Sequence, residues 1–266
     1  MKTSYLNLDQ PTLPSVDICG VRVSAVNLSL ACEIIEGWIK AQHKTYVCVA
    51  PVSMIVDSHS QEGYKAIVNQ AGMVTPDGMP LVWLAKSRGH KAVARTYGPD
   101  IMLRLCEISA KKGYKHYFYG GRPEVCEQLE TKLKKRFPGL SIAGRFSPPF
   151  SSDYHCEEEI LTKINQANPD ILWVALGSPK QDFWMAEYRG RLNVPVIVGV
   201  GAAFDFLSGA KKQAPLWMRK CGLEWFFRLC CEPKRLWKRY LIGNTKFIYY
   251  LLKDFLRSKT KMDIVL

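Results

Sequence analysis

The chain has 266 residues, of which 47% are apolar and 23% are charged, and this composition excludes disorder over most of its length. Its formal net charge of +13 indicates an anionic partner, such as nucleic acid, a phosphorylated substrate or a membrane surface. Nine cysteines without CxxC spacing argue against a disulfide framework and favour reduced thiols. The chain start lacks the apolar core of a signal peptide, and no run reaches the ~18 apolar residues of a spanning helix, so we expect any membrane contact to be peripheral.

Short β-rich runs alternate with helical patterns along the first two thirds of the chain. In chain order, we expect a strand or hairpin at 16–23, a helix at 30–41 capped by Asn27 or Ser29, a strand at 46–50, helical spacing at 52–69, a strand ending at Val74, a helix at 99–111, a strand at 116–119, a helix at 124–136, a strand at 141–144, a helix at 153–166, and strands at 171–176 and 194–200. The last two runs are almost continuously apolar, which is typical of strands buried on both faces. The sequence therefore predicts an α/β fold, a Rossmann-like parallel sheet flanked by helices.

One change of composition divides the chain. It falls near residues 209–215, after which aromatic and cationic residues alternate. We therefore expect a flexible N-terminus at 1–14, an α/β core at 15–210 and a basic, amphipathic, helical appendage at 211–266.

Glycine turns follow three of the predicted strands: Gly120 and Gly121, then Gly177, then Gly199 and Gly201. In an open parallel sheet, ligands bind beyond the carboxyl ends of the strands, where glycine lets the backbone approach and the next helix N-terminus favours phosphate. Three such turns indicate a nucleotide or phosphorylated ligand. Neither GxGxxG nor a Walker loop is present, which disfavours NAD enzymes and P-loop ATPases.

The segment GSPKQDFW (177–184) places Lys180, Gln181 and Asp182 at the start of a helix. The lysine and the glutamine can reach phosphate, ribose or base from the strand end. The same pattern also fits an ordinary helix start, with Pro179 in the first turn and Asp182 as an acid that suits the helix dipole.

The TPDGMP loop (75–80) holds Asp77 between a proline and a glycine. Turns often use this tripeptide, so Asp77 is either a turn residue or a rigidly held general base. Arg95 can position a phosphate or a carboxylate, or lie on the surface as a simple charge. The five histidines lack HxxxH and HExxH spacing, so we expect no metal site.

The segment 211–266 carries 14 Lys and Arg residues against four acidic residues, a surplus of ten positive charges. In EPKRLWKRYL (232–241), pairs of cations alternate with pairs of apolar residues, which on a helix separate into a cationic and an aromatic face. Such a helix suits a membrane interface or a lipid phosphate. The alternatives are a core-packing helix with a solvated basic face and a nucleic-acid-binding surface.

Six segments together resemble one family, the WecG/TagA/CpsF glycosyltransferases of bacterial surface polysaccharide, enterobacterial antigen and teichoic acid assembly. They are TPDGMPLVW (75–83), YGPDIM (97–102), YFYGG (117–121), GSPKQDFW (177–184), GVGAAFDFLSGAKKQAPLWM (199–218) and GLEWFFRL with EPKRLWKRYL (222–241). The resemblance spans roughly residues 15–250 in the same order.

The resemblance implies an inverting, metal-independent hexosyltransferase without a cofactor. It would move a sugar from a UDP-sugar to a saccharide on undecaprenyl diphosphate, on the cytoplasmic face of the bacterial membrane. Asp77 matches the proposed base, Arg95 is expected near the phosphates and Gln181 at the nucleotide. The expected donor-binding set is Arg95, Gly120, Gly121, Gly177, Lys180, Gln181, Gly201 and Asp205.

In the same way, the resemblance assigns cations of the appendage to the lipid diphosphate when the appendage meets the membrane. Arg228 and Arg235 match family arginines. A further family arginine is Lys238 here, which loses bidentate phosphate geometry, although Arg239 is adjacent.

Several positions depart from members that transfer N-acetylmannosamine. Those members have Thr and Asn after the second strand, where this chain has Val49 and Pro51, and PKQE reads PKQD, ending in Asp182. The VAPVSM stretch around Val49 and Pro51 and the SPPF stretch at 147–150 resemble members that extend exopolysaccharide repeat units with a glucose-type sugar, so the resemblance favours a glucose-type donor. A non-catalytic membrane scaffold of a polysaccharide assembly complex is the alternative function, and the exposed apolar faces also suit self-association.

Overall fold

The computed structural model describes residues 13–149 and 158–263. Of the segment 1–14, which we expected to be flexible, only the last two residues are among those described. The expected helix start at Asp153 and the last residue of the SPPF stretch, Phe150, lie outside the described residues. Of the helix expected at 153–166, the structure describes α7 (Glu158–Ala167).

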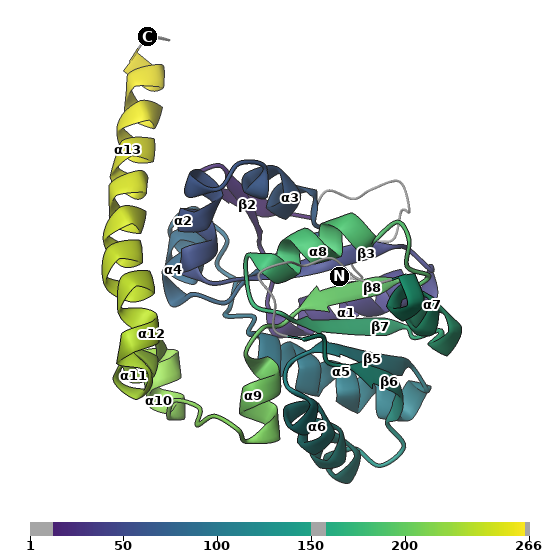
Figure 1. Cartoon of the computed structure of the whole chain (residues 1–266). Coiled ribbons are helices and arrows are strands. Elements are labelled where there is room, and N and C mark those ends of the chain that lie inside the picture. The colour runs from purple at the N-terminus through teal and green to yellow at the C-terminus, as the bar shows by residue number, and fades with distance from the viewer. Residues whose placement is uncertain (1–12, 150–157, 264–266) are drawn as a thin grey trace.

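A six-stranded parallel sheet forms the centre of the molecule (Figure 1). Its strands are β3 (Thr45–Ala50), β4 (Met73–Pro76), β5 (Lys115–Gly120), β6 (Ser141–Phe146), β7 (Ile171–Ala175) and β8 (Val196–Gly199), in the order β4-β3-β8-β7-β5-β6. A separate antiparallel hairpin, β1 (Ser15–Ile18) and β2 (Val21–Ser24), precedes them. The predicted α/β class with a parallel sheet is confirmed.

Alternate residues of each strand supply two apolar layers, because successive side chains point to opposite faces. In β3, Tyr46 and Cys48 join one buried cluster and Val47 and Val49 join the other. The first layer packs against the hairpin, α2 (Val52–Ser60), α3 (Tyr64–Gln70), α4 (Met79–Ser87), α7 and α8 (Lys180–Tyr188). The second packs against α1 (Leu28–Lys40), α5 (Gly98–Lys112), α6 (Pro123–Arg136) and α9 (Ala203–Ser208). Both faces of the sheet are therefore covered, as the apolar runs predicted.

Two local expectations can be compared directly with the structure. Asn27 caps α1, with its side chain accepting a hydrogen bond from the Leu30 backbone N–H at 3.0 Å. The continuous helical spacing expected over 52–69 is wrong, since α2 ends at Ser60 and α3 begins at Tyr64. Between them Gly63 has φ +72°, a left-handed conformation that no continuing helix contains.

In the described part of the chain after α9, the helices are α10 (Leu216–Lys220), α11 (Glu224–Cys231), α12 (Pro233–Trp237) and α13 (Gly243–Asp263), with a π-helical turn at Lys238–Ile242. They lie at one side of the sheet, and α13 passes beside α2 before extending past the core (Figure 1). Among the described residues, no helix combines the length and apolar character required to cross a bilayer.

Candidate functional site

The loop after β4 is anchored from two sides. The Asp77 backbone N–H donates to the carbonyl of Ala50 at the end of β3 (3.1 Å). On the other side, Thr75 Oγ1 donates to the Thr96 carbonyl (3.1 Å), and the Thr96 N–H donates to the Pro76 carbonyl (2.9 Å). Both threonines are fully buried. Asp77 therefore stands in a rigid turn at the carboxyl edge of the sheet, beside the segment that carries Arg95.

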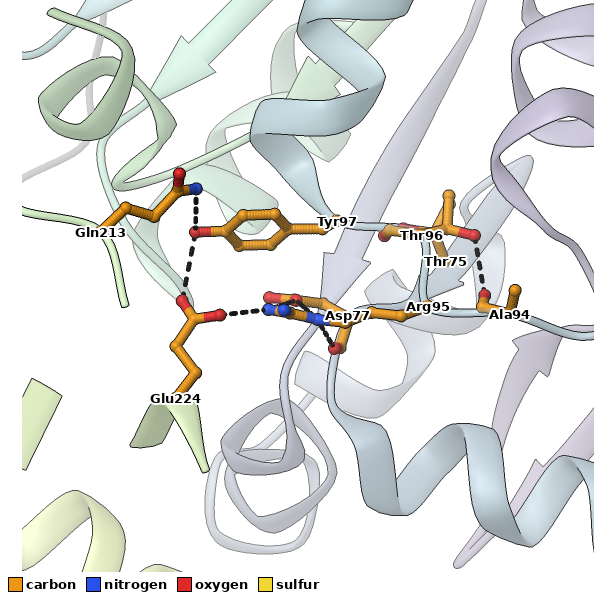
Figure 2. A network of polar contacts seen from close by, with 8 residues as sticks. All are labelled: Thr75, Asp77, Ala94, Arg95, Thr96, Tyr97, Gln213 and Glu224. Carbon is orange, nitrogen blue, oxygen red and sulfur yellow. Dashed lines mark hydrogen bonds and ion pairs between the residues drawn. The ribbon is translucent and has the colours of Figure 1, made fainter. Parts of the chain in front are cut away.

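Arg95 contacts Asp77 through three hydrogen bonds (Figure 2). Its Nε lies 2.7 Å from the Asp77 carbonyl oxygen and 3.1 Å from Oδ1, and its Nη2 lies 2.7 Å from the same Oδ1. The Tyr97 ring covers the guanidinium, with 4.1 Å between the ring centroid and Cζ. Hydrogen bonds on one edge and an aromatic ring on one face hold this guanidinium in place.

The appendage adds a second carboxylate to this cluster. Glu224, the first residue of α11, lies with Oε2 2.8 Å from Arg95 Nη2, and its Oε1 accepts a hydrogen bond from the Tyr97 hydroxyl at 3.1 Å (Figure 2). Gln213, in the linker before α10, donates to the same hydroxyl at 3.3 Å. The predicted base and the predicted phosphate-binding arginine therefore meet where core and appendage touch.

Burial dominates the electrostatics of this cluster. It raises the pKa of the Asp77 carboxyl above its ordinary value, with Arg95 and Arg228 opposing the rise and Glu224 adding to it. Desolvation opposes the charge of Arg95, yet the two carboxylates beside it raise its pKa and keep it protonated. The raised pKa makes Asp77 a stronger base, which suits it to accept a proton. Arg95 stays positively charged beside it, which suits it to bind a phosphate.

Gln181 joins two loops at the carboxyl edge. Its Oε1 accepts hydrogen bonds from the backbone N–H of Gly177 after β7 (3.2 Å) and of Gly201 after β8 (3.0 Å), and its Nε2 donates to Ser178 (3.2 Å). The side chain is buried, with 2% of the residue exposed. It fixes the spacing of the two glycine turns, and the expected contact with the nucleotide stays a prediction.

The neighbouring glycines differ in what they make possible. Gly120 has φ +107°, and a Cβ there would lie 2.7 Å from the Ala175 carbonyl, so this position serves close packing of β5 on β7. Gly177 has φ +80°, and a Cβ there would meet no atom within 4 Å. The turn after β7 is therefore open, as a ligand-binding loop needs to be. Lys180 is half-buried at the first position of α8.

Asp205 belongs to a chain of charges between core and appendage. Lys211 Nζ lies 3.2 Å from Asp205 Oδ2 on α9 and 3.4 Å from Glu232 Oε1, and Glu232 also pairs with Arg235 at 2.6 Å. Arg235 is exposed. The structure thus places Asp205 at the contact of core and appendage, and Arg235 at the outer end of the chain.

The other predicted appendage cations divide into inward and outward groups. Arg239 donates from Nε and Nη2 to Ser53 Oγ in the first turn of α2 (3.0 and 2.7 Å), and its burial lowers its pKa. Arg228 lies over the Phe206 ring, 5.6 Å from the centroid. Lys238 is exposed beside the Trp237 ring at 5.6 Å. Arg228 and Arg239 therefore face the core, and Lys238 faces outward.

Sequence reasoning missed four residues of this site: Ser53, Tyr97, Gln213 and Glu224. Tyr97 and Glu224 lie within the matching YGPDIM and GLEWFFRL segments, and Glu224 is an acid within a strongly cationic stretch. An acidic residue in a cationic stretch was the signal in the sequence that could have identified Glu224. Within residues 13–149 and 158–263, no group of three His, Cys, Asp or Glu side chains is arranged to hold a metal ion, and metal independence stays a prediction.

Comparison with known proteins bears on the nature of this site. The profile of the Glycosyl transferase WecG/TagA/CpsF family matches residues 16–261. An N-acetylglucosaminyldiphosphoundecaprenol N-acetyl-beta-D-mannosaminyltransferase of Bacillus subtilis is 32% identical over 74% of this chain and 75% of the relative. The proteins of the same name from Bacillus spizizenii and Staphylococcus aureus are 34% identical over 71% of this chain and 72% of the relative, and 26% identical over 93% and 94%. This chain belongs to the WecG/TagA/CpsF family and is a glycosyltransferase.

Proposed function

We propose that this chain is an inverting hexosyltransferase that uses a UDP-sugar donor and an acceptor saccharide on polyprenyl diphosphate. The observation that carries the proposal is the cluster of Asp77, Arg95 and Glu224 at the carboxyl edge of the sheet, where core and appendage meet. The names of the relatives support a lipid-diphosphate acceptor. The glycine turns on the same edge support a nucleotide donor.

The proposed chemistry is a single displacement. Asp77 accepts the proton of an acceptor hydroxyl while that oxygen forms a bond to the anomeric carbon. The bond from this carbon to the diphosphate oxygen breaks, and UDP leaves with the electron pair. Because attack and departure occur on opposite faces, the anomeric configuration inverts. Arg95, Arg228 and Arg239 stabilise the charge that develops on the diphosphates.

The donor is proposed to be a glucose-type sugar, in contrast to the N-acetylmannosamine in the names of the relatives. The end of β3 offers no side-chain amide, because Val49 is only 7% exposed within an apolar cluster and Pro51 precedes α2. A pocket without that amide lacks a hydrogen-bond donor and acceptor for an N-acetyl group.

The appendage, residues 211–266, is proposed to rest on the anionic inner face of the bacterial cytoplasmic membrane. Its exposed apolar side chains support this placement. Among the side chains that the structure describes, the large apolar ones with more than a third of their surface exposed are Trp83 and, in the appendage, Leu216, Trp217, Leu223, Phe226, Trp237, Leu241, Ile242, Ile248, Tyr249, Leu252, Phe255 and Leu256. Trp83 itself lies beside Gly222 of the appendage.

The test is UDP release by the full chain in the presence of EDTA, with a polyprenyl-diphosphate-linked monosaccharide in anionic vesicles and a panel of UDP-sugars. We expect release with one donor of the glucose type. Asp77→Asn should lower kcat by ~10²–10⁴-fold, the usual contribution of a general base. Asp170→Asn is the matched control. Asp170 directly precedes β7 and accepts a hydrogen bond from the Lys115 backbone N–H, so it lies at the amino edge of the sheet, opposite to the edge that carries Asp77.

The outcomes separate the parts of the proposal. Near-wild-type turnover in Asp77→Asn would remove Asp77 as the base. Loss of activity with EDTA would contradict metal independence. A protein that neither releases nor binds UDP would support the non-catalytic scaffold instead.

A further inference from the structure

Glu224 is an acidic residue at the contact of the appendage with the core. It begins α11, and only 11% of its side chain is exposed. Its two carboxylate oxygens make different contacts, Oε2 with the Arg95 guanidinium and Oε1 with the Tyr97 hydroxyl. A buried carboxylate costs desolvation free energy, which these contacts offset.

The Arg95 guanidinium contacts two carboxylates, those of Asp77 and Glu224. The single nitrogen Nη2 lies 2.7 Å from Asp77 Oδ1 and 2.8 Å from Glu224 Oε2. One positive charge therefore serves two carboxylates from segments far apart in the chain. We infer that Glu224 is a positioning residue that shares the Arg95 guanidinium with Asp77, so that the arginine stays fixed while Asp77 remains basic enough to accept a proton. The inference rests on the proposed function, in which Asp77 is the base.

The charged groups around Asp77 come from two elements. Arg95 precedes α5, and Glu224 and Arg228 belong to α11; the two arginines lower the pKa of Asp77 and Glu224 raises it. Glu224 in turn also raises the pKa values of Tyr97, Asp100 and Tyr240. Burial is the largest cause of the raised Asp77 pKa, and among the charged groups Glu224 offsets part of the lowering by the two arginines.

Loss of this negative charge has two effects in the same direction. The repulsion that disfavours an ionised Asp77 disappears. The positive charge of Arg95 also no longer pairs with a second carboxylate, so it stabilises ionised Asp77 more strongly. Both effects lower the basicity of Asp77. In Glu224→Gln the single amide oxygen can accept from Arg95, and the amide nitrogen can donate to the Tyr97 hydroxyl oxygen. This variant therefore removes the charge and leaves a polar contact at each of the two positions.

The experiment is a pH titration of the Asp77 carboxyl in the full chain by ¹³C NMR, with its signal assigned by its absence in Asp77→Asn. In Glu224→Gln we expect the Asp77 pKa to fall by about one unit, as for the removal of a nearby like charge. The acid limb of kcat/KM should move to lower pH with it, and kcat should fall severalfold. Glu224→Asp, which keeps the charge, should restore the wild-type profile in large part.

Glu130→Gln is the matched control, because Glu130 also lies between two cations, Lys134 and Arg145, and its side chain is 19% exposed. It should leave the pKa of Asp77 unchanged. An unchanged or raised pKa of Asp77 in Glu224→Gln would overturn the inference, since a purely structural Glu224 predicts that result. If the pKa falls but the acid limb does not follow it, the sharing stands and Asp77 fails as the base.

Discussion

Asp182, the last residue of the PKQD motif, is a buried carboxyl that holds the start of a helix. It lies in the first turn of α8, fully buried, and its Oδ2 accepts a hydrogen bond from the Tyr64 hydroxyl of α3 at 2.6 Å. Burial raises its pKa to about 6, although Tyr64, Ser178, Cys48 and Gln181 stabilise the charged form. Neutral donors thus compensate only part of the desolvation cost. Because Asp182 follows Gln181, this contact also fixes the start of α8.

The raised pKa of Asp182 predicts a pH dependence of stability. The folded state binds this proton more tightly than the unfolded state, so the contribution is greatest at low pH and is lost as pH rises through about 6. Asp182→Asn removes this term. Its free energy of unfolding relative to wild type should therefore rise by on the order of 1 kcal/mol between about pH 5 and about pH 7.5, as measured by urea unfolding.

The comparison between variants isolates Asp182 from other titrating groups. Burial lowers the pKa of His116 to about 3, which gives a slope of opposite sign in both proteins and cancels. Parallel stability curves for Asp182→Asn and wild type over this pH range would contradict the prediction.

At the scale of elements, the appendage is held by few buried side chains. Phe247 of α13 is 4% exposed and packs in the core cluster with Tyr250 and Leu251, and Tyr250 stacks on His59 of α2 at 4.2 Å. The next residue, Ile248, is 58% exposed. Adjacent positions on α13 thus separate packing on the core from exposure to the outside.

This separation predicts different effects of two alanine substitutions. Phe247→Ala should destabilise the docking of α13 on α2 by about 3–5 kcal/mol, the usual cost of removing a buried phenylalanine ring. Hydrogen exchange of the α13 amides should accelerate accordingly, while the sheet keeps its protection. Ile248→Ala is the matched control and should leave exchange unchanged. Equal exchange in the two variants would show that α13 is not docked through Phe247.

At the scale of the whole molecule, charge and exposed apolar surface gather on the same part of the chain. The appendage carries the surplus of ten positive charges and, apart from Trp83, all of the strongly exposed large apolar side chains among those that the structure describes. The appendage lies at one side of the sheet (Figure 1), and its Glu224 contacts Arg95 of the core, so the proposed membrane contact would lie on the part of the chain that reaches the proposed site. This arrangement supports an acceptor that is delivered from the bilayer surface.

Membrane binding should therefore depend on the charge of the lipid and on which side of the protein a charge is changed. We expect the full chain to sediment with vesicles that contain anionic phosphatidylglycerol, less with neutral phosphatidylcholine vesicles, and less again at high salt. Lys253→Glu on α13 should weaken binding roughly tenfold or more, at about 1 kcal/mol per charge near the surface. Lys135→Glu on α6 is the matched charge reversal and should have little effect. Equal loss in both variants would argue against a membrane-facing appendage.

The sequence alone predicted the parts that depend on near neighbours. The apolar runs at 171–176 and 194–200 indicated buried strands, and the structure has them at Ile171–Ala175 and Val196–Gly199. The Pro-Asp-Gly turn identified Asp77 as a candidate base and Arg95 was a candidate for positioning a phosphate or a carboxylate, and the resemblance pointed to the same two residues. Strand periodicity and turn chemistry depend on a few consecutive residues, which explains why these inferences were possible.

Only the tertiary structure decided which distant groups meet. The strand order, the break between α2 and α3, the inward direction of Gln181 and the contact of Glu224 with Arg95 follow from how helices pack on the sheet. Glu224 reads in the sequence as one acid among many cations, and its significance arises because α11 brings it to a buried arginine of the core. Local patterns specify elements, but the packing of those elements sets the distances between charges, and those distances determine the chemistry of the site.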